Sequence, residues 1–154
     1  NTGALEYMTY EEKVCWLRRY RQALRAEDRL RDQIRAVRAR MESTSQALRP
    51  VVGGSSGDGN AIEHGVELLD RYQRDLVEQL EKSQKIRAEI EDAIYALPDH
   101  LQREVLLARY IDGLPVWRTA NRLHISERWV LNNQNRAIKN LQTVHASSPF
   151  DGVN

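Results

Sequence analysis

The sequence predicts an all-α protein, in which a long antiparallel, coiled-coil-like helical hairpin precedes a three-helix helix-turn-helix domain. Only 6% of the 154 residues are aromatic and 29% are charged, and the chain is rich in helix-forming residues. Apolar side chains recur every three or four residues along two long stretches, as they do on the buried stripe of a helix. We expect residues 1–8, which end at a plausible initiator methionine, to be a tag or disordered.

The first helix is predicted from Thr9 to Arg49. Thr9 and Glu12 have the spacing of a capping box, in which each side chain accepts a hydrogen bond from the backbone of the other residue. No Gly or Pro interrupts the segment before Pro50, and its apolar stripe has the steps of a coiled-coil seam. The stripe consists of Tyr10, Val14, Leu17, Tyr20, Leu24, Leu30, Ile34, Val37 and Met41, with Glu27 in the one gap.

Residues 50–60 contain four glycines, two serines and a proline, which predicts a flexible loop. A second helix is predicted over 61–97, again with a heptad stripe. Three polar residues interrupt this stripe and are candidates for fixing register or partner choice. The stripe runs Ile62, Val66, Leu69, Gln73, Leu76, Leu80, Ser83, Arg87, Ile90, Ile94 and Leu97.

The two long segments carry opposite net charge. Residues 9–49 hold 11 Lys/Arg against 6 Asp/Glu, and residues 60–97 hold 5 against 9. An antiparallel hairpin within one chain would bury both stripes and pair the charges. A homo-oligomer formed through the same helices would do so equally well, and the sequence leaves both arrangements open.

The helix-turn-helix domain is predicted over 98–145, followed by a disordered tail over 146–154. Asp99 caps its first helix, with Gln102 as the capping-box partner, and this helix ends at Gly113. A short helix follows over 115–123, with proline at its first position. After a tight turn at 124–125, Ser126 caps a last helix that extends to about residue 142.

The geometry of a helix-turn-helix places demands on particular positions. Ala120 is the small residue needed where the last two helices cross, and His124 occupies the turn position that favours positive φ. Trp129 is expected to pack on the first helix of the domain rather than against a sugar-phosphate chain. The predicted core anchors are Val116, Leu123, Ile125, Val130, Ala137 and Leu141.

Opposite the core stripe of the last helix, Arg128, Asn132, Asn135 and Lys139 follow one another at helical spacing. Cations and amides are the groups that recognise guanine and adenine edges and bind phosphate. Asn is a weak helix former, so the amide run over 132–135 requires a reason, and DNA recognition would supply one. The full set of predicted DNA-binding residues is Arg118, Arg122, Glu127, Arg128, Leu131, Asn132, Asn135, Arg136 and Lys139.

The segment from Leu97 to Leu141 resembles the fourth region of bacterial sigma factors, the promoter-recognising helix-turn-helix. The resemblance rests on Leu97-Pro98, Arg103 to Leu106, Arg109-Tyr110, Asp112 to Leu114, Ala120, Leu123, Ile125-Ser126, Val130, Ala137 and Leu141. Thr119, His124 and Gln134 depart from the family's pattern. In its whole architecture the chain looks like phage-encoded regulators of the RinA/ArpU type.

This resemblance implies a phage or prophage regulator of late or packaging genes that acts with host RNA polymerase on double-stranded DNA. Nothing before Leu97 resembles a promoter-melting module, so a regulator that recruits polymerase is favoured over a complete sigma factor. Two alternatives remain open. One is a small terminase subunit that binds phage DNA for packaging, and the other is a protein-binding helical adaptor that never contacts DNA.

Catalysis is not expected. The four histidines are dispersed, the glycine-rich segment lacks a lysine and a preceding strand, and Cys15 is a lone thiol. We therefore predict no catalytic residues, no cofactor and no metal. No apolar run approaches the length of a membrane span, and we expect a cytoplasmic protein without a membrane partner.

Overall fold

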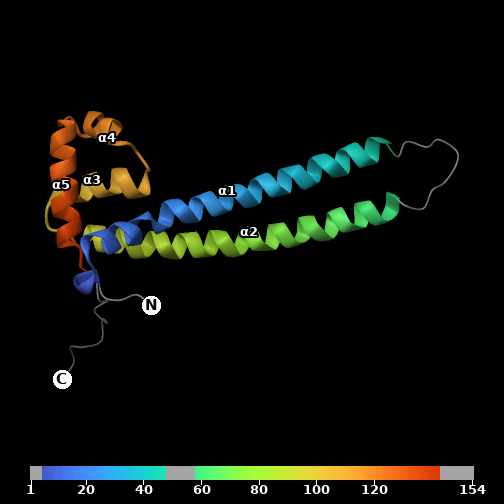
Figure 1. The fold of residues 1–154 in the computed structure, drawn as a ribbon, viewed down its shortest axis with the longest axis horizontal. Coiled ribbons are helices and arrows are strands. Elements are labelled where there is room, and N and C mark those ends of the chain that lie inside the picture. Colours follow the sequence, from blue (N-terminus) through green and yellow to red (C-terminus); the bar gives the residue numbers. More distant parts are fainter. Residues whose placement is uncertain (1–4, 48–57, 143–154) are drawn as a thin grey trace, which may run out of the picture. The chain divides into compact units, whose positions relative to one another are not determined.

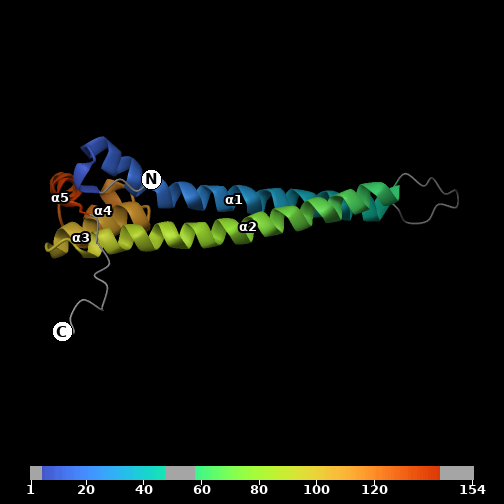
Figure 2. The same cartoon turned by 90° about the horizontal axis from the view of Figure 1, so that it is seen from below.

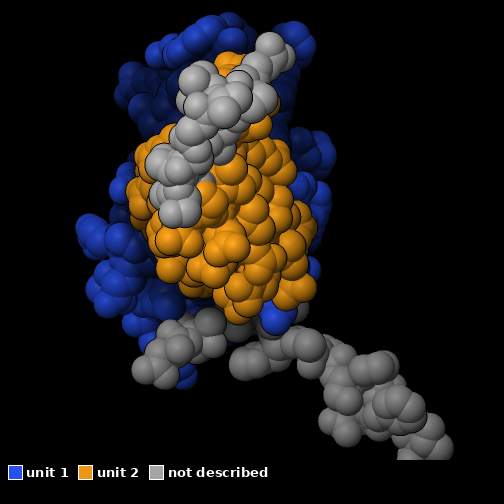
Figure 3. Space-filling view, turned by 90° about the vertical axis from the view of Figure 1, so that its right-hand side faces the viewer, with its two compact units in different colours: residues 1–21, 85–154 blue, residues 22–84 orange. Residues whose placement is uncertain are grey.

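The computed structural model describes residues 5–47 and 58–142. These residues form helices, and no strand occurs among them, as the sequence predicts. They divide into two compact units, shown in different colours in Figure 3. Unit 1 is the described part of residues 1–21 and 85–154, and unit 2 is the described part of residues 22–84. Both long helices therefore contribute to both units.

The first long helix, α1 (Tyr10–Ala47), begins with the predicted capping box. The Thr9 backbone N–H donates to the Glu12 carboxylate at 2.8 Å, and the Glu12 N–H donates to the Thr9 hydroxyl at 3.2 Å. A short 3-10 helix, η1 (Leu5–Tyr7), precedes it, and Leu5 is buried. Part of the segment expected to be a tag or disordered is therefore ordered, because Leu5 has an apolar core to enter.

The second long helix, α2 (Asp58–Tyr95), starts three residues earlier than expected, so residues 58–60 of the predicted loop are helical. Residues 50–57 of that loop and residues 143–154, which include the predicted tail, lie outside the described residues. Figures 1 and 2 show α1 and α2 side by side and antiparallel, the arrangement that the hairpin prediction required.

The predicted stripe of α1 is confirmed. None of its ten residues is exposed, and in unit 2 Ile34, Val37 and the gap-filling Glu27 are buried. Charge pairing between the helices is sparser than their opposite net charges suggest. Arg19 to Glu89, at 2.9 Å in unit 1, is the one ion pair between α1 and α2 among the described residues, and most others lie within a single helix.

The stripe predicted for α2 is only partly correct. Val66 is 51% exposed and Gln73 is exposed, whereas Gly65, Leu68 and Tyr72 are half-buried. A Cβ added to Gly65 would lie 3.0 Å from the Met41 Cγ atom, so the absence of a side chain lets Met41 lie against the α2 backbone. At positions 66 and 73 the covered face lies one residue away from the predicted stripe, whereas the other predicted residues of α2 are buried or half-buried.

Unit 1 contains the first turns of α1, the last turns of α2, the short helix η1, and four further elements that follow α2: α3 (His100–Leu106), η2 (Leu107–Ile111), α4 (Val116–Leu123) and α5 (Glu127–Asn140). The helix expected to run to Gly113 changes to π-helical geometry at η2, where the Asp112 N–H donates to the Leu107 carbonyl five residues back. Helix α4 starts at Val116, with Pro115 as its N-cap residue instead of its first helical residue.

The compact unit is larger than the domain predicted over 98–145. Leu17, Ile90 and Ile94 are fully buried within unit 1 together with Leu106 and Ile138. The base of the hairpin thus supplies part of the hydrophobic core that the helix-turn-helix helices share.

Candidate nucleic-acid interface

Helix α5 is held in place by one fully buried face. Val130, Ala137, Ile138 and Leu141 have no solvent exposure, and Val130 joins Val105 of α3 and Ala120 of α4 in one cluster. Leu101, Val116, Leu123 and Ile125 pack against this cluster. Each predicted core anchor of the helix-turn-helix is buried or half-buried, so the predicted inward face is confirmed.

The turn between α4 and α5 has the predicted geometry. His124 adopts the left-handed conformation, with φ 55° and ψ 44°, and the next residue, Ile125, donates its N–H to the Ala120 carbonyl at 3.1 Å. The Ser126 hydroxyl then accepts from the Trp129 N–H at 3.1 Å and caps α5. Local hydrogen bonds therefore fix where the last helix begins.

Two departures from the sigma-factor pattern have internal hydrogen-bond partners. The Gln134 side-chain oxygen accepts from Arg109 Nε at 2.8 Å, and Arg109 also donates to the Leu114 carbonyl at 2.7 Å. The buried Thr119 hydroxyl donates to the Pro115 carbonyl at 3.1 Å. Each polar group is thus satisfied inside the unit, as buried polar groups must be.

The amide run of α5 is not one recognition surface. Asn133 is buried and donates to the Trp129 carbonyl at 2.8 Å, and Gln134 bonds to Arg109. The Asn135 side-chain oxygen accepts from the Tyr10 hydroxyl at 2.6 Å. Among the described residues, only Asn132 of these four has no hydrogen-bond partner. DNA recognition is therefore not needed to explain most of the run.

The N-terminal half of α5 presents a face that no described residue contacts through a hydrogen bond or ion pair. Arg128, Leu131 and Asn132 lie on this face, and all three are exposed, Leu131 by 44%. Glu127 is exposed in the first turn, where a carboxylate stabilises the positive end of the helix dipole. These four side chains are the predicted site residues that the fold leaves available in the N-terminal half of α5.

Two tryptophans of α4 and α5 are exposed. Trp117 of α4 is 52% exposed and lies under the Arg118 guanidinium, at 5.3 Å from its ring centroid. Trp129 of α5 is 40% exposed, with the Arg136 guanidinium 5.7 Å from its ring centroid. At 40% exposure Trp129 is partly covered, so the expectation that it packs on α3 stays a prediction.

The remaining predicted cations differ in their surroundings. Arg122 donates to the Asp112 carboxylate at 2.6 Å, so it is not a free cation, although both side chains are about half exposed. The Lys139 side chain is exposed on the last turn of α5. Arg103 and Arg109, which belong to α3 and η2, are instead half-buried and bound to backbone carbonyls.

The C-terminal half of α5 is held by the first turns of α1. The buried Lys13 ammonium donates to the Lys139 carbonyl at 3.0 Å and to the Leu141 carbonyl at 3.1 Å, and so caps the end of α5. Burial lowers the pKa of Lys13 from its ordinary value. Sequence analysis missed this contact because no local pattern links residues more than 120 positions apart.

Comparison of the chain with protein-family models, curated proteins and solved structures found no match. Among the described residues, no group of three or more His, Cys, Asp or Glu side chains has the arrangement of a metal site. The same residues contain no helix that is both long enough and apolar enough to span a membrane.

Proposed function

We propose that the protein binds double-stranded DNA through the N-terminal half of α5 and regulates transcription by binding, without catalysis. The observation that carries the proposal is the contrast between the two faces of α5. One face is fully buried at Val130 and Ala137, and the other leaves Arg128, Leu131 and Asn132 without an intramolecular partner. A rigid helix with an unoccupied polar face is suited to enter a major groove.

The chemistry of this face matches base edges. Arg donates two hydrogen bonds to guanine, Asn pairs with adenine through its carbonyl and amino groups, and an aliphatic side chain contacts the thymine methyl group. Three cations are exposed on α4 and α5, namely Arg118, Arg136 and Lys139. They are suited to phosphate contacts, which position a protein on DNA without recognising its sequence.

The proposed role in transcription regulation rests on the resemblance to sigma-factor region 4. It supports host RNA polymerase as the second partner and late-gene activation in a phage or prophage as the setting. The hairpin would then bind polymerase or a second copy of the chain in place of a promoter-melting module.

The test is a binding-site selection from random duplex DNA with the full chain, followed by affinity measurements against salt. We expect a defined site, and a fall in log affinity with log salt of about 0.9 per phosphate contact. Arg128→Ala or Asn132→Ala should cost about 1–3 kcal/mol at that site and relax one base position, because a bidentate contact is lost. Lys139→Ala should weaken all sequences about equally.

Arg74→Ala is the matched control. It removes one exposed positive charge from unit 2, where Arg74 pairs with Asp70 at 3.1 Å, and it should leave the selected site unchanged. No binding to duplex DNA at low salt, or a selected site that survives both Arg128→Ala and Asn132→Ala, would reject α5 as the recognition helix.

A protein-binding function is the second candidate, and one observation favours it. Trp117, Trp129 and Leu131 are three large exposed hydrophobic side chains on α4 and α5, and large apolar side chains in solvent are typical of protein interfaces when they form one patch. For that function, binding of duplex DNA would be absent, and Trp117→Ala would abolish capture of a protein partner.

A further inference from the structure

Asn132 and Asn135 carry the same amide group, three residues apart on the exposed side of α5, but their surroundings differ. The side-chain amide of Asn132 has no hydrogen-bond partner among the described residues. The Asn135 oxygen is 2.6 Å from the Tyr10 hydroxyl oxygen, a contact across 125 residues of sequence. The two amides therefore differ in the free protein, because one is already hydrogen-bonded and the other is not.

The length of this contact identifies the atoms that form it. Hydrogen bonds from a hydroxyl to an oxygen span about 2.5–3.0 Å, whereas those between a nitrogen and an oxygen rarely fall below about 2.7 Å. At 2.6 Å the Tyr10 hydroxyl donates to the carbonyl oxygen of Asn135, and the amino group of Asn135 has no hydrogen-bond partner among the described residues.

The backbone on both sides of Tyr10 is fixed. Thr9 and Glu12 form the capping box that starts α1, and Lys13, one turn along, is anchored to the last carbonyls of α5. Tyr10 itself is half-buried. Its hydroxyl is thus held against α5 by neighbouring contacts, and reorienting the Asn135 amide would break a bond that is already formed.

A bidentate contact with adenine needs both groups of an asparagine in the plane of the base. The carbonyl oxygen accepts from the adenine amino group, and the asparagine amino group donates to the adenine N7. Asn132 can present both groups. Tyr10 occupies one of the two lone pairs of the Asn135 oxygen and fixes the orientation of the amide, so Asn135 can present both groups only to a base that lies in that fixed plane.

We propose that Tyr10 is a specificity-determining residue: by fixing the Asn135 amide it keeps that amide from turning into the plane of an adenine, and it leaves Asn132 as the adenine-recognising asparagine of α5. This inference rests on the proposed function. Asn135 then binds an acceptor such as a phosphate oxygen or guanine and contributes affinity without an adenine preference.

The test compares binding sites selected by the wild type, Tyr10→Phe, Asn135→Ala and the double variant, all as full chains. Tyr10→Phe keeps the ring and removes only the hydroxyl. We expect it to add an adenine preference of about 5-fold or more at one base pair, the size of a new bidentate contact. Asn135→Ala in the same background should abolish that preference. Tyr95→Phe, which removes the hydroxyl of an exposed tyrosine, is the matched control and should select the wild-type site.

A second readout does not depend on DNA. The side-chain amide resonances of Asn135 in the free protein should shift in Tyr10→Phe, while those of Asn132 should not. Unshifted Asn135 resonances, or the same selected site for Tyr10→Phe and wild type, would overturn the role of Tyr10 and leave the proposed function intact. Absence of duplex binding by the wild type would instead overturn the proposed function, and this inference with it.

Discussion

Unit 1 and unit 2 are both helical, but they enclose their side chains to different extents. In unit 1 a set of large aliphatic side chains is fully buried, among them Leu17, Ile94, Leu106 and Ile138. Among the largest fully buried side chains of the described residues, Ser83 is the one from unit 2. Two helices cover each other on one side only, whereas the several helices of unit 1 surround a core.

One end of unit 2 contains a polar layer. The Ser83 hydroxyl donates to the Gln79 carbonyl at 2.8 Å, and the Gln79 side chain donates to the Ala23 carbonyl at 3.4 Å. Glu27 is buried nearby along α1 and pairs with Arg31 at 3.4 Å. Such residues stabilise less than aliphatic ones, and they can fix the register of two helices.

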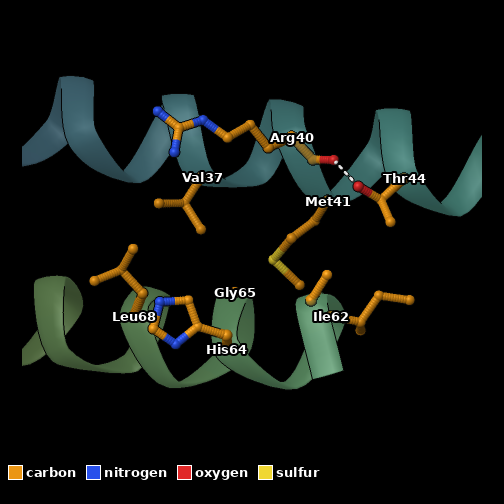
Figure 4. Close-up of a pocket in the computed structure, with 9 residues that line it drawn as sticks. Val37, Arg40, Met41, Thr44, Ile62, His64, Gly65 and Leu68 are labelled. Carbon is orange, nitrogen blue, oxygen red and sulfur yellow. Dashed lines mark hydrogen bonds between the residues drawn. The ribbon is translucent and has the colours of Figure 1, made fainter. Parts of the chain in front are cut away.

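Unit 2 also contains a cavity of about 180 Å³ between α1 and α2. Figure 4 shows Val37 and Met41 of α1 above Gly65 and Leu68 of α2, with the Met41 side chain reaching toward the glycine. A flexible side chain beside open space can move at little cost. Unit 2 should therefore tolerate changes in volume that unit 1 does not.

The largest effect is expected from Leu106→Ala in unit 1. Leu106 is fully buried, and its truncation should lower the free energy of unfolding by about 3–5 kcal/mol, because both transfer energy and cavity energy are lost. Urea denaturation followed by circular dichroism measures the change. A loss below about 1 kcal/mol would contradict the tight enclosure of unit 1.

A smaller effect is expected from Ile34→Ala in unit 2. Ile34 is buried but lies in a seam that is covered on one side, so the loss should be about 2 kcal/mol. Amide hydrogen exchange should accelerate in residues 22–47 and 58–84 more than in α3 and α5. Equal acceleration in both units would show that they unfold as one and would remove the distinction between them.

Lys13→Met tests the two hydrogen bonds that the Lys13 side chain of α1 donates to the end of α5. Methionine keeps the apolar stem but leaves the Lys139 and Leu141 carbonyls without their donor, so we expect a loss of about 1–2 kcal/mol. Hydrogen exchange should increase in the last turn of α5. Lys82→Met, at an exposed position of α2, is the control and should have no measurable effect.

Small effects that differ in sign are expected from a pair of glycine substitutions. Gly113 in unit 1 has φ +70°, so Gly113→Ala should cost about 1–2 kcal/mol of backbone strain. Gly65 in unit 2 lies in a helix, where alanine is favoured by about 0.5–1 kcal/mol. Because Met41 can move into the adjoining cavity, Gly65→Ala should raise the melting temperature. Destabilisation by both variants would show that unit 2 is packed as tightly as unit 1.

Features that depend on neighbours in sequence were predicted correctly. The capping box of Thr9, the N-caps Asp99 and Ser126, and the left-handed His124 each depend on residues within one helical turn. The stripe of α1 was also predicted, since its period follows from helix geometry. These features are local, and the sequence contains all the groups that form them.

Features that depend on distant partners were not predicted. Val66 was assigned to the seam because its spacing fits, but a heptad pattern does not say which neighbouring face a partner helix will cover. Asn135 was assigned to the DNA-binding face from its spacing and residue type, whereas its oxygen is bound by Tyr10. Residue type shows what an amide can bind, and only the fold shows whether it is already bound.

By itself, the sequence determined the all-helical class, the caps, the turn and the inward face of α5. All of these follow from hydrogen bonds and periodicities that span a few residues. The tertiary structure decided which predicted site residues remain available. The contacts of Tyr10 and Lys13 with α5 engage its C-terminal half and leave Arg128, Leu131 and Asn132 unoccupied. The reason is that contacts between residues more than 100 positions apart depend on how whole helices pack, which no local pattern encodes.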